Sequence, residues 1–378
     1  MLTICWPRPR AAASHAAVPT LPDAPADGAW RAREHAALLA ADVDAVWTGE
    51  RDVAQADHAS APGVHLIWSF NAHAWHVRKA KDCKAGWQQR APRPSAAEAF
   101  ESNAVFRARC LRALLEVHGD AALDGGADAD ARLRQCAVRL SGSWVLTFQP
   151  LVAAALVRRY GGAGGVVYDP CAGWGGRLLG AAVAGAAAYI ACEPAARTHA
   201  GLAALAEQYA GGMRVQLERR GAEDFQPEAG SVDVALTSPP YFNLELYSDE
   251  PSQSHVRYPT AQWWTTQWLR RVVERTYTAL KPGGYFLVNV ANNRQLLDGG
   301  CDLEGATQAS AAHAGFEAHG CLRMLKPTAP GVDGAATRSV DSAEPIFVFR
   351  KPVVAAPPAV VGGADKSTRA LGALLAGW

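Results

Sequence analysis

The feature that most constrains the fold of this chain is an alternation of short apolar strands and helices that begins after Gln149. The first four units predict helix, strand, helix and strand, and they read "PLVAAALVRRYGG", "GVVYDP", "WGGRLLGAAVAG" and "AYIACEP". The alternation continues with a helix in "HAGLAALAEQYAGG" and strands in "MRVQLERRG" and "SVDVALTSPP". Strands that alternate with helices are typical of a parallel sheet that is covered by helices on both faces.

The following segment completes this sheet. A long amphipathic helix, "TAQWWTTQWLRRVVERTYTALKPGG", precedes a strand in "YFLVNVAN". Two further strands are predicted in "GFEAHGCLRML" and "EPIFVFRKP". The sequence therefore predicts an α/β fold, a Rossmann-like sheet that ends in an antiparallel pair of strands.

The rest of the chain divides by composition. Residues 1–30 are rich in proline and alanine, with no acid in the first 22, so we expect a disordered or targeting-like segment. Residues 31–143 contain helical patterns such as "AREHAALLAADVDAVW" and "SAAEAFESNAVFRARCLRALLEVHG". We expect a helical N-terminal region there, which could select a target, then the α/β domain over 144–352 and a tail over 353–378.

Composition excludes several classes of protein. No apolar run reaches the roughly 18 residues of a membrane span. The eight cysteines have no close pairs, so neither a zinc site nor a disulfide scaffold is predicted. His73 and His76 lack a third ligand, and we expect no metal. An intracellular protein is expected, in the cytoplasm or nucleoid of a prokaryote or virus-infected cell, or in an organelle or nucleus of a eukaryote.

One segment is strongly basic although the net charge is only +1. Between positions 78 and 93, six basic residues stand against the single acid Asp82, among several tryptophans. Basic residues can bind phosphates and aromatic rings can stack on bases, so this segment nominates nucleic-acid contacts at Arg78, Lys79 and Lys81. The alternative is a solvated charged face beside a small aromatic core.

A glycine-rich loop follows the first predicted strand, at "YDPCAGWGGRLLGA". Its glycines let the backbone pass close to a ligand, and the helix that follows exposes unpaired N–H groups. The spacing G-x-G-G lacks the full dinucleotide fingerprint, so an adenosine-containing ligand is favoured over NAD. Glu193 follows the second strand, 24 residues after Asp169, where an acid can receive ribose hydroxyls.

"DPCAGWGGR" followed by "TSPPY" resembles the S-adenosylmethionine-dependent DNA amino-methyltransferases, which methylate cytosine N4 or adenine N6, and most of all their phage-type branch. The resemblance covers roughly Trp144 to Pro352 and implies a Rossmann-like methyltransferase fold. It also implies S-adenosylmethionine as the cofactor. By this resemblance the cofactor-binding residues are Phe148, Asp169, Cys171, Ala172, Gly173, Gly175 and Glu193. The resemblance implies an adenine-binding acid after the next strand, where this chain reads "RRGAEDF". Glycine and alanine stand in the first positions there, so the acid is Glu223 or Asp224.

The exocyclic amine of a nucleobase is a poor nucleophile, because its lone pair is delocalised into the ring. Methylation therefore needs acceptors that bind the amine hydrogens, and the Ser-Pro-Pro-Tyr turn can supply them. Ser238 and the carbonyl of Pro239 can accept the amine hydrogens, and Pro239 and Pro240 fix the backbone that presents them. Tyr241 offers a flat face on which a flipped base can stack. Beyond the turn, Phe242 is expected to close the pocket, and Asn243 is a candidate for contacts with the target strand.

The predicted function is methyl transfer to the exocyclic amine of a flipped base in DNA. Serine at the head of the turn favours cytosine N4 over adenine N6. An RNA base methyltransferase is the nearest alternative, and a catalytically inactive nucleic-acid-binding protein with the same fold is another. The sequence leaves open the recognition sequence, the strandedness of the substrate and the oligomeric state.

Overall fold

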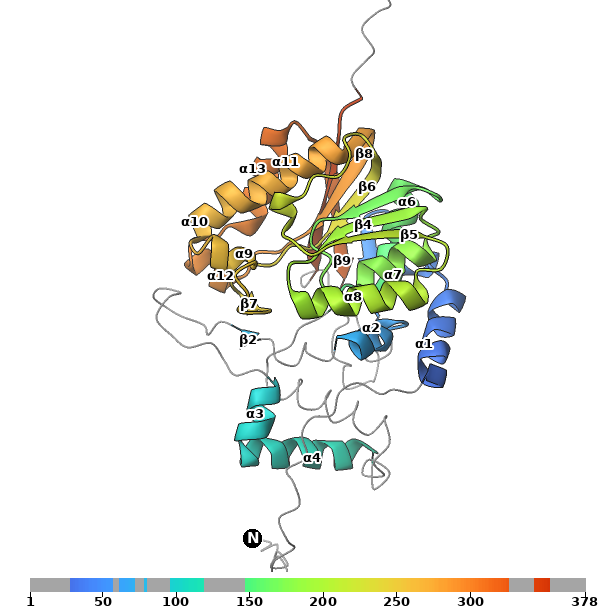
Figure 1. The fold of residues 1–378 in the computed structure, drawn as a ribbon, viewed down its shortest axis with the longest axis vertical. Coiled ribbons are helices and arrows are strands. Elements are labelled where there is room, and N and C mark those ends of the chain that lie inside the picture. Colours follow the sequence, from blue (N-terminus) through green and yellow to red (C-terminus); the bar gives the residue numbers. More distant parts are fainter. Residues whose placement is uncertain are drawn as a thin grey trace, which may run out of the picture.

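An eight-stranded sheet organises the molecule (Figure 1). The computed structural model describes residues 28–56, 61–71, 78–79, 96–118, 147–325 and 343–353. Across the sheet, the strands follow the order β1 (Asp52–Ala54), β9 (Glu317–Leu325), β10 (Glu344–Arg350), β8 (Leu280–Asn289), β6 (Val232–Thr237), β3 (Val166–Asp169), β4 (Ala188–Cys192) and β5 (Arg214–Glu218).

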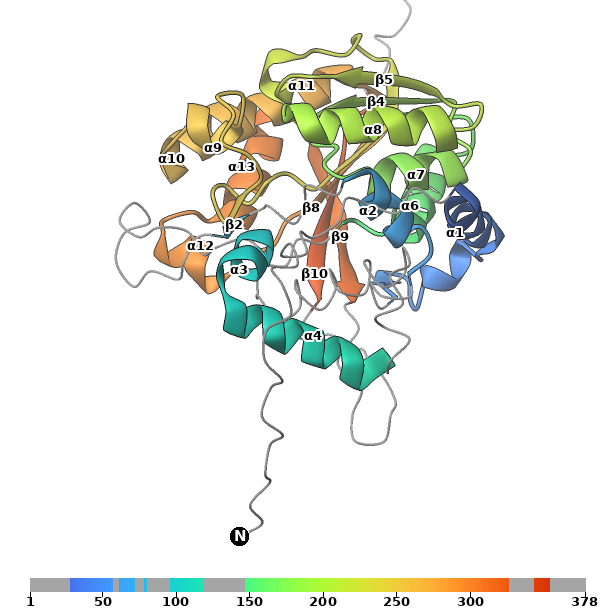
Figure 2. The same ribbon diagram turned by 60° about the horizontal axis from the view of Figure 1, so that its bottom comes forward.

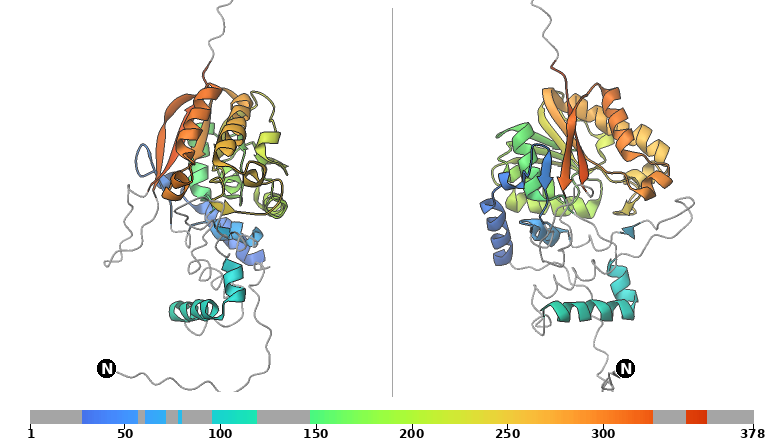
Figure 3. Two further views of the ribbon diagram at one scale, coloured as in Figure 1. Left: turned by 90° about the vertical axis from the view of Figure 1, so that its left-hand side faces the viewer. Right: turned by 180° about the vertical axis from the view of Figure 1, so that it is seen from behind.

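The central strands are parallel, as the alternation in the sequence predicts. β3 pairs in parallel with both β4 and β6, β4 with β5, and β6 with β8. β10 runs antiparallel to β8 and to β9 (Figure 3). The expected α/β fold with a closing antiparallel pair is therefore confirmed.

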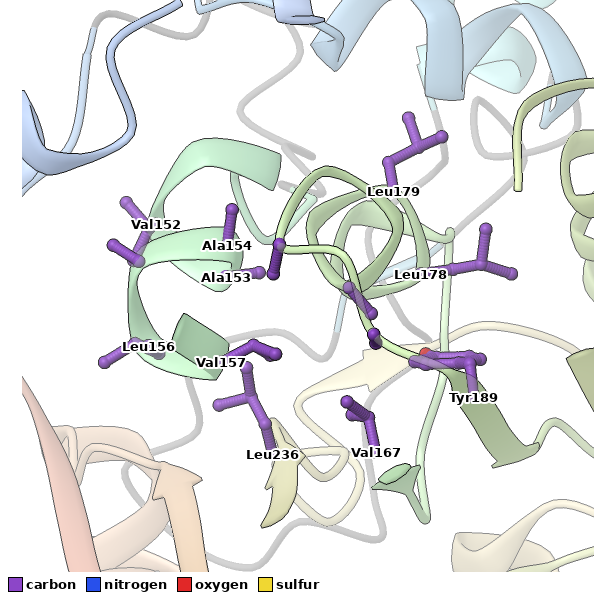
Figure 4. Packing of buried hydrophobic residues seen from close by; sticks show 14 of the residues in the cluster. Val152, Ala153, Ala154, Leu156, Val157, Val167, Leu178, Leu179, Tyr189 and Leu236 are labelled. Carbon is purple, nitrogen blue, oxygen red and sulfur yellow. The ribbon is translucent and has the colours of Figure 1, made fainter. Parts of the chain in front are cut away.

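Helices cover both faces of this sheet. α6 (Pro150–Gly161), α7 (Gly176–Val183) and α8 (Ala196–Tyr209) pack on one face, with α11 (Arg270–Ala279) and α13 (Leu303–Ala314) on the other (Figure 1). Successive strand residues alternate between the two cores because side chains point to opposite faces of a strand. Val167 packs against α6 and α7 (Figure 4), whereas its neighbour Tyr168 lies in the other core.

The long predicted helix is not regular. It consists of α10 (Ala261–Trp263), a π-helical turn η5 (Trp264–Leu269) and α11. The hydroxyls of Thr265 and Thr266 donate to the carbonyls of Ala261 and Gln262. Shorter helices complete the domain, namely η4 (Ala222–Asp224), α9 (Ser254–Arg257) and α12 (Arg294–Asp298).

The N-terminal region is helical in part. It contains α1 (Gly28–Ala40), η1 (Asp44–Val46) and α2 (Val64–Phe70). The single helix expected from Ser95 is divided into α3 (Ala96–Ser102) and α4 (Ala104–His118), because Asn103 interrupts it and its side chain caps the nitrogen of Phe106. Figures 1 and 3 show these two helices apart from the sheet, and Figure 2 shows α3 next to the start of α4. A further helix that the sequence predicts, in "DADARLRQCAVRL", lies outside the described residues.

The N-terminal region also contributes to the sheet itself. The helix expected up to Ala56 ends early, and the chain forms β1, which pairs in parallel with β9. Arg323 donates two hydrogen bonds to the Asp52 carboxylate, at 2.7 and 2.8 Å. The side chain of Gln149 makes reciprocal hydrogen bonds with the backbone of Ala56, at 2.6 and 3.0 Å. Residues before position 144, where the sequence predicts that the α/β domain begins, therefore contribute a strand to its sheet.

The sequence predicts neither a membrane span nor a metal site. Among the described residues, no helix is long and apolar enough to cross a membrane, and no group of three acids, histidines or cysteines could hold a metal ion. His73 and His76 lie outside these residues, as do most of the two predicted terminal segments.

Gln149 provides a test of how the N-terminal region is attached. The side chain of Gln149 is buried, and Gln149→Leu leaves the N–H and the C=O of Ala56 without their hydrogen-bond partners. We therefore expect the free energy of unfolding to fall by about 2 kcal/mol. Urea unfolding monitored by circular dichroism measures this. The control Gln216→Leu, whose amide bonds only to Glu218 at the surface, is expected to change stability by less than about 0.5 kcal/mol. Equal stability of the two variants would contradict the attachment.

Candidate cofactor and substrate cavity

A cavity of about 620 Å³ lies beyond the carboxyl ends of the parallel strands, where ligands bind in open α/β sheets. It brings together most of the predicted site residues. Those that line it are Phe148, Cys171, Ala172, Gly173, Glu193, Glu223, Ser238, Pro239, Pro240 and Tyr241. The glycine loop and the Ser-Pro-Pro-Tyr turn therefore face one space, although about 60 residues separate them in the sequence.

The glycine loop connects β3 to α7 and has the backbone that its sequence predicts. Gly173 and Gly175 have φ values of +57° and +102°, which side-chain-bearing residues rarely adopt. A Cβ on Gly176 would lie 1.8 Å from the carbonyl oxygen of Phe148, so only glycine fits there. Gly175 does not line the cavity, because it packs on Leu202 and Leu205 of α8.

Asp169 is fully buried, and it does not line the cavity. Its carboxylate accepts hydrogen bonds from Arg177, Tyr189 and Thr237 at 2.7 to 2.8 Å. Burial alone would lower the pKa of Arg177, but Asp169, Tyr189 and Cys171 together raise it above its usual value. Arg177 also donates to the carbonyl of Cys171. Asp169 therefore holds the loop in place without facing the cavity, and no motif in the sequence identified Arg177 as its partner.

Glu193 lies at the end of β4 and lines the cavity. One carboxylate oxygen accepts from the N–H of Ala195 at 2.8 Å. Burial raises the pKa of Glu193 to about 8, and the backbone hydrogen bonds from Ala195 and Gly173 offset this only in part. Hydroxyl groups that donate hydrogen bonds to such a carboxylate would stabilise its charged form.

The two acids after β5 differ in position. Glu223 is fully buried and lines the cavity, whereas the side chain of Asp224 is 44% exposed and does not. Arg257 bridges both carboxylates, with contacts of 2.5 Å to each. The indole of Trp268 donates to the second oxygen of Glu223 at 2.9 Å. Of the two alternatives that the sequence left open, only Glu223 faces the cavity.

The Ser-Pro-Pro-Tyr turn follows β6 directly, so the buried strand fixes its position. Burial raises the pKa of Tyr241 well above its usual value, which keeps the phenol neutral, and its hydroxyl makes a backbone hydrogen bond with Ala291 after β8. Tyr241 is thus held at its far end while the ring borders the cavity.

Phe242 and Asn243 lie behind the turn rather than in the cavity. Phe242 is 3% exposed and packs against Trp264, with ring centroids 5.9 Å apart. Its φ of +51° is the only positive value of a non-glycine residue in the described part of the chain. A bulky residue in this conformation stores strain, which clusters at functional sites. Phe242 therefore anchors the turn in the core and does not close the pocket.

The segment after the turn forms another wall of the cavity. The ring of Tyr247 contacts Trp174 of the glycine loop at 5.8 Å, and Trp174 contacts Trp68 of α2 at the same distance. The Glu250 carboxylate accepts from the N–H of Ala196 at the start of α8, at 3.1 and 3.2 Å. This segment is thereby fixed beside Glu193.

The basic segment begins next to this wall. β2 (Arg78–Lys79) pairs antiparallel with β7 (Glu245–Leu246), and Lys79 stands opposite Glu245, which lines the cavity. The structure thus places the backbone of Arg78 and Lys79 near the cavity, and Lys81 lies outside the described residues.

The ion pair of Arg177 with Asp169 yields a stability prediction. Arg177→Met leaves a buried carboxylate without its cation, so we expect the free energy of unfolding to fall by about 3–5 kcal/mol in urea titrations. The double variant with Asp169→Asn is expected to recover part of this loss. Arg220→Met serves as the control, because its pair with Glu218 is 55% exposed on the arginine side and contributes little. An Arg177→Met protein as stable as that control would refute the role assigned to the pair.

No protein-family model and no curated protein sequence matches the chain. Among solved structures, TrmN from Thermus thermophilus is 18% identical with a TM-score of 0.35, over 53% of this chain and 48% of TrmN, so the match spans about half of that protein. A protein provisionally described as an RNA methyltransferase from Pyrococcus horikoshii is 16% identical with a TM-score of 0.35, over 54% of this chain and 83% of its own.

The N-methyltransferase NodS from Bradyrhizobium japonicum, solved in complex with S-adenosyl-L-homocysteine, is 12% identical with a TM-score of 0.36, over 53% of this chain and 85% of NodS. Identities and scores of this size say nothing of substrate or mechanism, and the strand order and helix layers identify the architecture. The strand order and the helices on both faces of the sheet give the chain a Rossmann-like α/β fold.

Proposed function

We propose that this protein transfers a methyl group from S-adenosylmethionine to the exocyclic amine of a flipped base in DNA, with cytosine N4 favoured. The observation that carries the proposal is the single cavity that joins Glu193 and the glycine loop to the Ser-Pro-Pro-Tyr turn. A methyl donor and a methyl acceptor must share one space, since the transferred group moves directly between them.

The residues present fit the cofactor. Four carboxylates and one guanidinium line the cavity, from Glu193, Glu223, Glu245, Glu344 and Arg177. This acidic lining suits a sulfonium, which supplies the methyl group when the cofactor is bound. Glu193 would receive the ribose hydroxyls, Glu223 would receive the adenine amine, and Phe148 and the loop from Cys171 to Gly173 would hold the methionine end.

The turn would supply the amine chemistry. The Ser238 hydroxyl and the Pro239 carbonyl would accept the amine hydrogens, which concentrates the nitrogen lone pair toward the methyl group. Tyr241 would stack on the flipped base. A thiolate nucleophile is disfavoured, because burial raises the pKa of Cys171, which among the described cysteines alone lines the cavity, well above its usual value.

Nucleic acid would approach along the ribbon of β2 and β7. The backbone pairing of Arg78 and Lys79 with β7 supports this, because Glu245 of β7 lines the cavity and basic residues can bind the phosphates on either side of a flipped base. RNA remains the second candidate, since an unpaired base in RNA presents the same amine. Serine at the head of the turn supports cytosine over adenine.

Nucleoside mass spectrometry tests the reaction. After incubation of DNA, and separately RNA, with the protein and S-adenosylmethionine, we expect N4-methylcytosine in the DNA digest. Ser238→Ala and Tyr241→Ala are expected to lower the initial rate at least about a hundredfold, because each removes a group that orients or holds the amine.

Ser231→Ala is the matched control, since this serine lies outside the cavity and its hydroxyl bonds only to the carbonyl of Glu228. N6-methyladenine in place of N4-methylcytosine would overturn the base assignment. A methylated base only in RNA would overturn the polymer, and cofactor binding without any methylated base would favour a non-catalytic binding protein.

The raised pKa of Glu193 makes ribose binding pH-dependent. Ribose hydroxyls donate to the ionised carboxyl, so ligand binding must release the proton that the free carboxyl holds below about pH 8. The affinity is therefore expected to rise with pH, by up to about tenfold per unit below pH 8, and to level off above it. Calorimetry with 5′-methylthioadenosine, which has the ribose but no amino-acid group, measures this effect. Glu193→Gln is expected to bind more weakly and with a much smaller pH dependence, and a wild-type profile that is flat would count against the ribose role.

A further inference from the structure

The π-helical turn η5 carries a pair of stacked tryptophans. The rings of Trp264 and Trp268 lie 4.4 Å apart and 30° from parallel. Both side chains are buried, at 0% and 3% exposure, whereas Trp263, one residue before the turn, is 49% exposed. A π-helical turn is rare, costs regular hydrogen bonding, and is frequently found at functional sites.

Both buried indoles direct their N–H groups to residues of the cavity wall. Trp268 Nε1 donates to Glu223 Oε2 at 2.9 Å, and Trp264 Nε1 donates to Ser254 Oγ at 3.0 Å. Glu223, Ser254 and Trp268 itself all line the cavity. The extra residue of the π turn thus presents two indole donors toward one end of the cavity.

Glu223 needs such donors, because an isolated charge is costly to bury. Its side chain is fully buried, and Arg257 contacts Oε1 at 2.5 Å while Trp268 binds Oε2. A carboxylate can accept four hydrogen bonds, and Arg257, Trp268 and the backbone N–H of Glu223 supply three, so one position remains for a ligand donor. An indole N–H can only donate, which fixes the sense of this contact.

We propose that Trp268, presented by the π-helical turn, is a positioning residue that holds the Glu223 carboxylate in the orientation that receives the adenine amine of the cofactor. This inference rests on the proposed function, because it assumes that S-adenosylmethionine occupies the cavity. It assigns no role in methyl transfer itself to Trp268.

The charges around Glu223 determine how this contact depends on pH. Burial raises the pKa of Glu223, while Arg257 of α9 and the Trp268 indole lower it, and Asp224 opposes them. Tyr258 and Cys192 also interact with Glu223, and both are neutral because burial raises the pKa of each. Loss of the indole N–H is therefore expected to raise the pKa of Glu223 further, so that its charged form is lost at a higher pH.

Trp268→Phe tests the inference, because phenylalanine retains an aromatic ring and removes the N–H. Calorimetry with S-adenosylhomocysteine at pH 6 to 8 is expected to show binding about tenfold weaker than wild type, with the largest loss at low pH. The KM for S-adenosylmethionine is expected to rise while kcat at saturating cofactor stays within about twofold. Trp263→Phe is the matched control, and its binding is expected to equal that of wild type.

A double-mutant cycle with Glu223→Gln separates positioning from packing. If Trp268 acts through Glu223, Trp268→Phe is expected to cost much less in the Glu223→Gln background. Additive losses, or an unchanged affinity of Trp268→Phe, would overturn the inference while wild-type binding leaves the proposed function standing. Failure of the wild-type protein to bind S-adenosylhomocysteine would overturn both. Thermal unfolding of each variant identifies any loss that comes from a disrupted core.

Discussion

The site depends on one buried interaction, the hydrogen-bonded cluster around the Asp169 carboxylate. Asp169 ends β3 and accepts from Arg177 of α7, Tyr189 of β4 and Thr237 of β6. These bonds join three neighbouring strands and the helix that follows the glycine loop, at the edge of the sheet where the cavity opens. A buried charge with this many donors is stabilised only in one arrangement. The glycine loop and the Ser-Pro-Pro-Tyr turn are therefore fixed relative to each other.

Much of the fold could be predicted from sequence, because its signals are local. Periodicity identified the strands. The carboxyl ends of parallel strands meet at one edge of a sheet, which predicts that the glycine loop and the Ser-Pro-Pro-Tyr turn lie together, and both line one cavity. The misses concern non-local pairing and irregular geometry. β1 has only three residues and pairs with a strand about 270 positions away, and nothing in "QWWTTQWL" distinguishes a π turn from an α-helix.

Within the site, the sequence identified motifs but could not separate the residues that face a ligand from those that hold the motif in place. Both kinds alternate within a few positions, and only tertiary packing decides between them. Gly173 lines the cavity, whereas Gly175 packs on α8. Tyr241 lines it, whereas Phe242 turns into the core through its left-handed backbone. Glu223 and Asp224 face different environments for the same reason.

The two halves of the cavity share their supports. An aromatic path leads from Phe242 behind the base turn through Trp264 to Trp268, which holds Glu223. On the other side, Glu250 of the segment after the turn caps α8 beside Glu193. Because packed side chains transmit displacement, a ligand that orders Glu193 and Glu223 would also order the cavity walls at the Ser-Pro-Pro-Tyr turn. Under the proposed function, cofactor and base would therefore each bind more tightly when the other is present, since the second ligand finds walls that the first has already fixed.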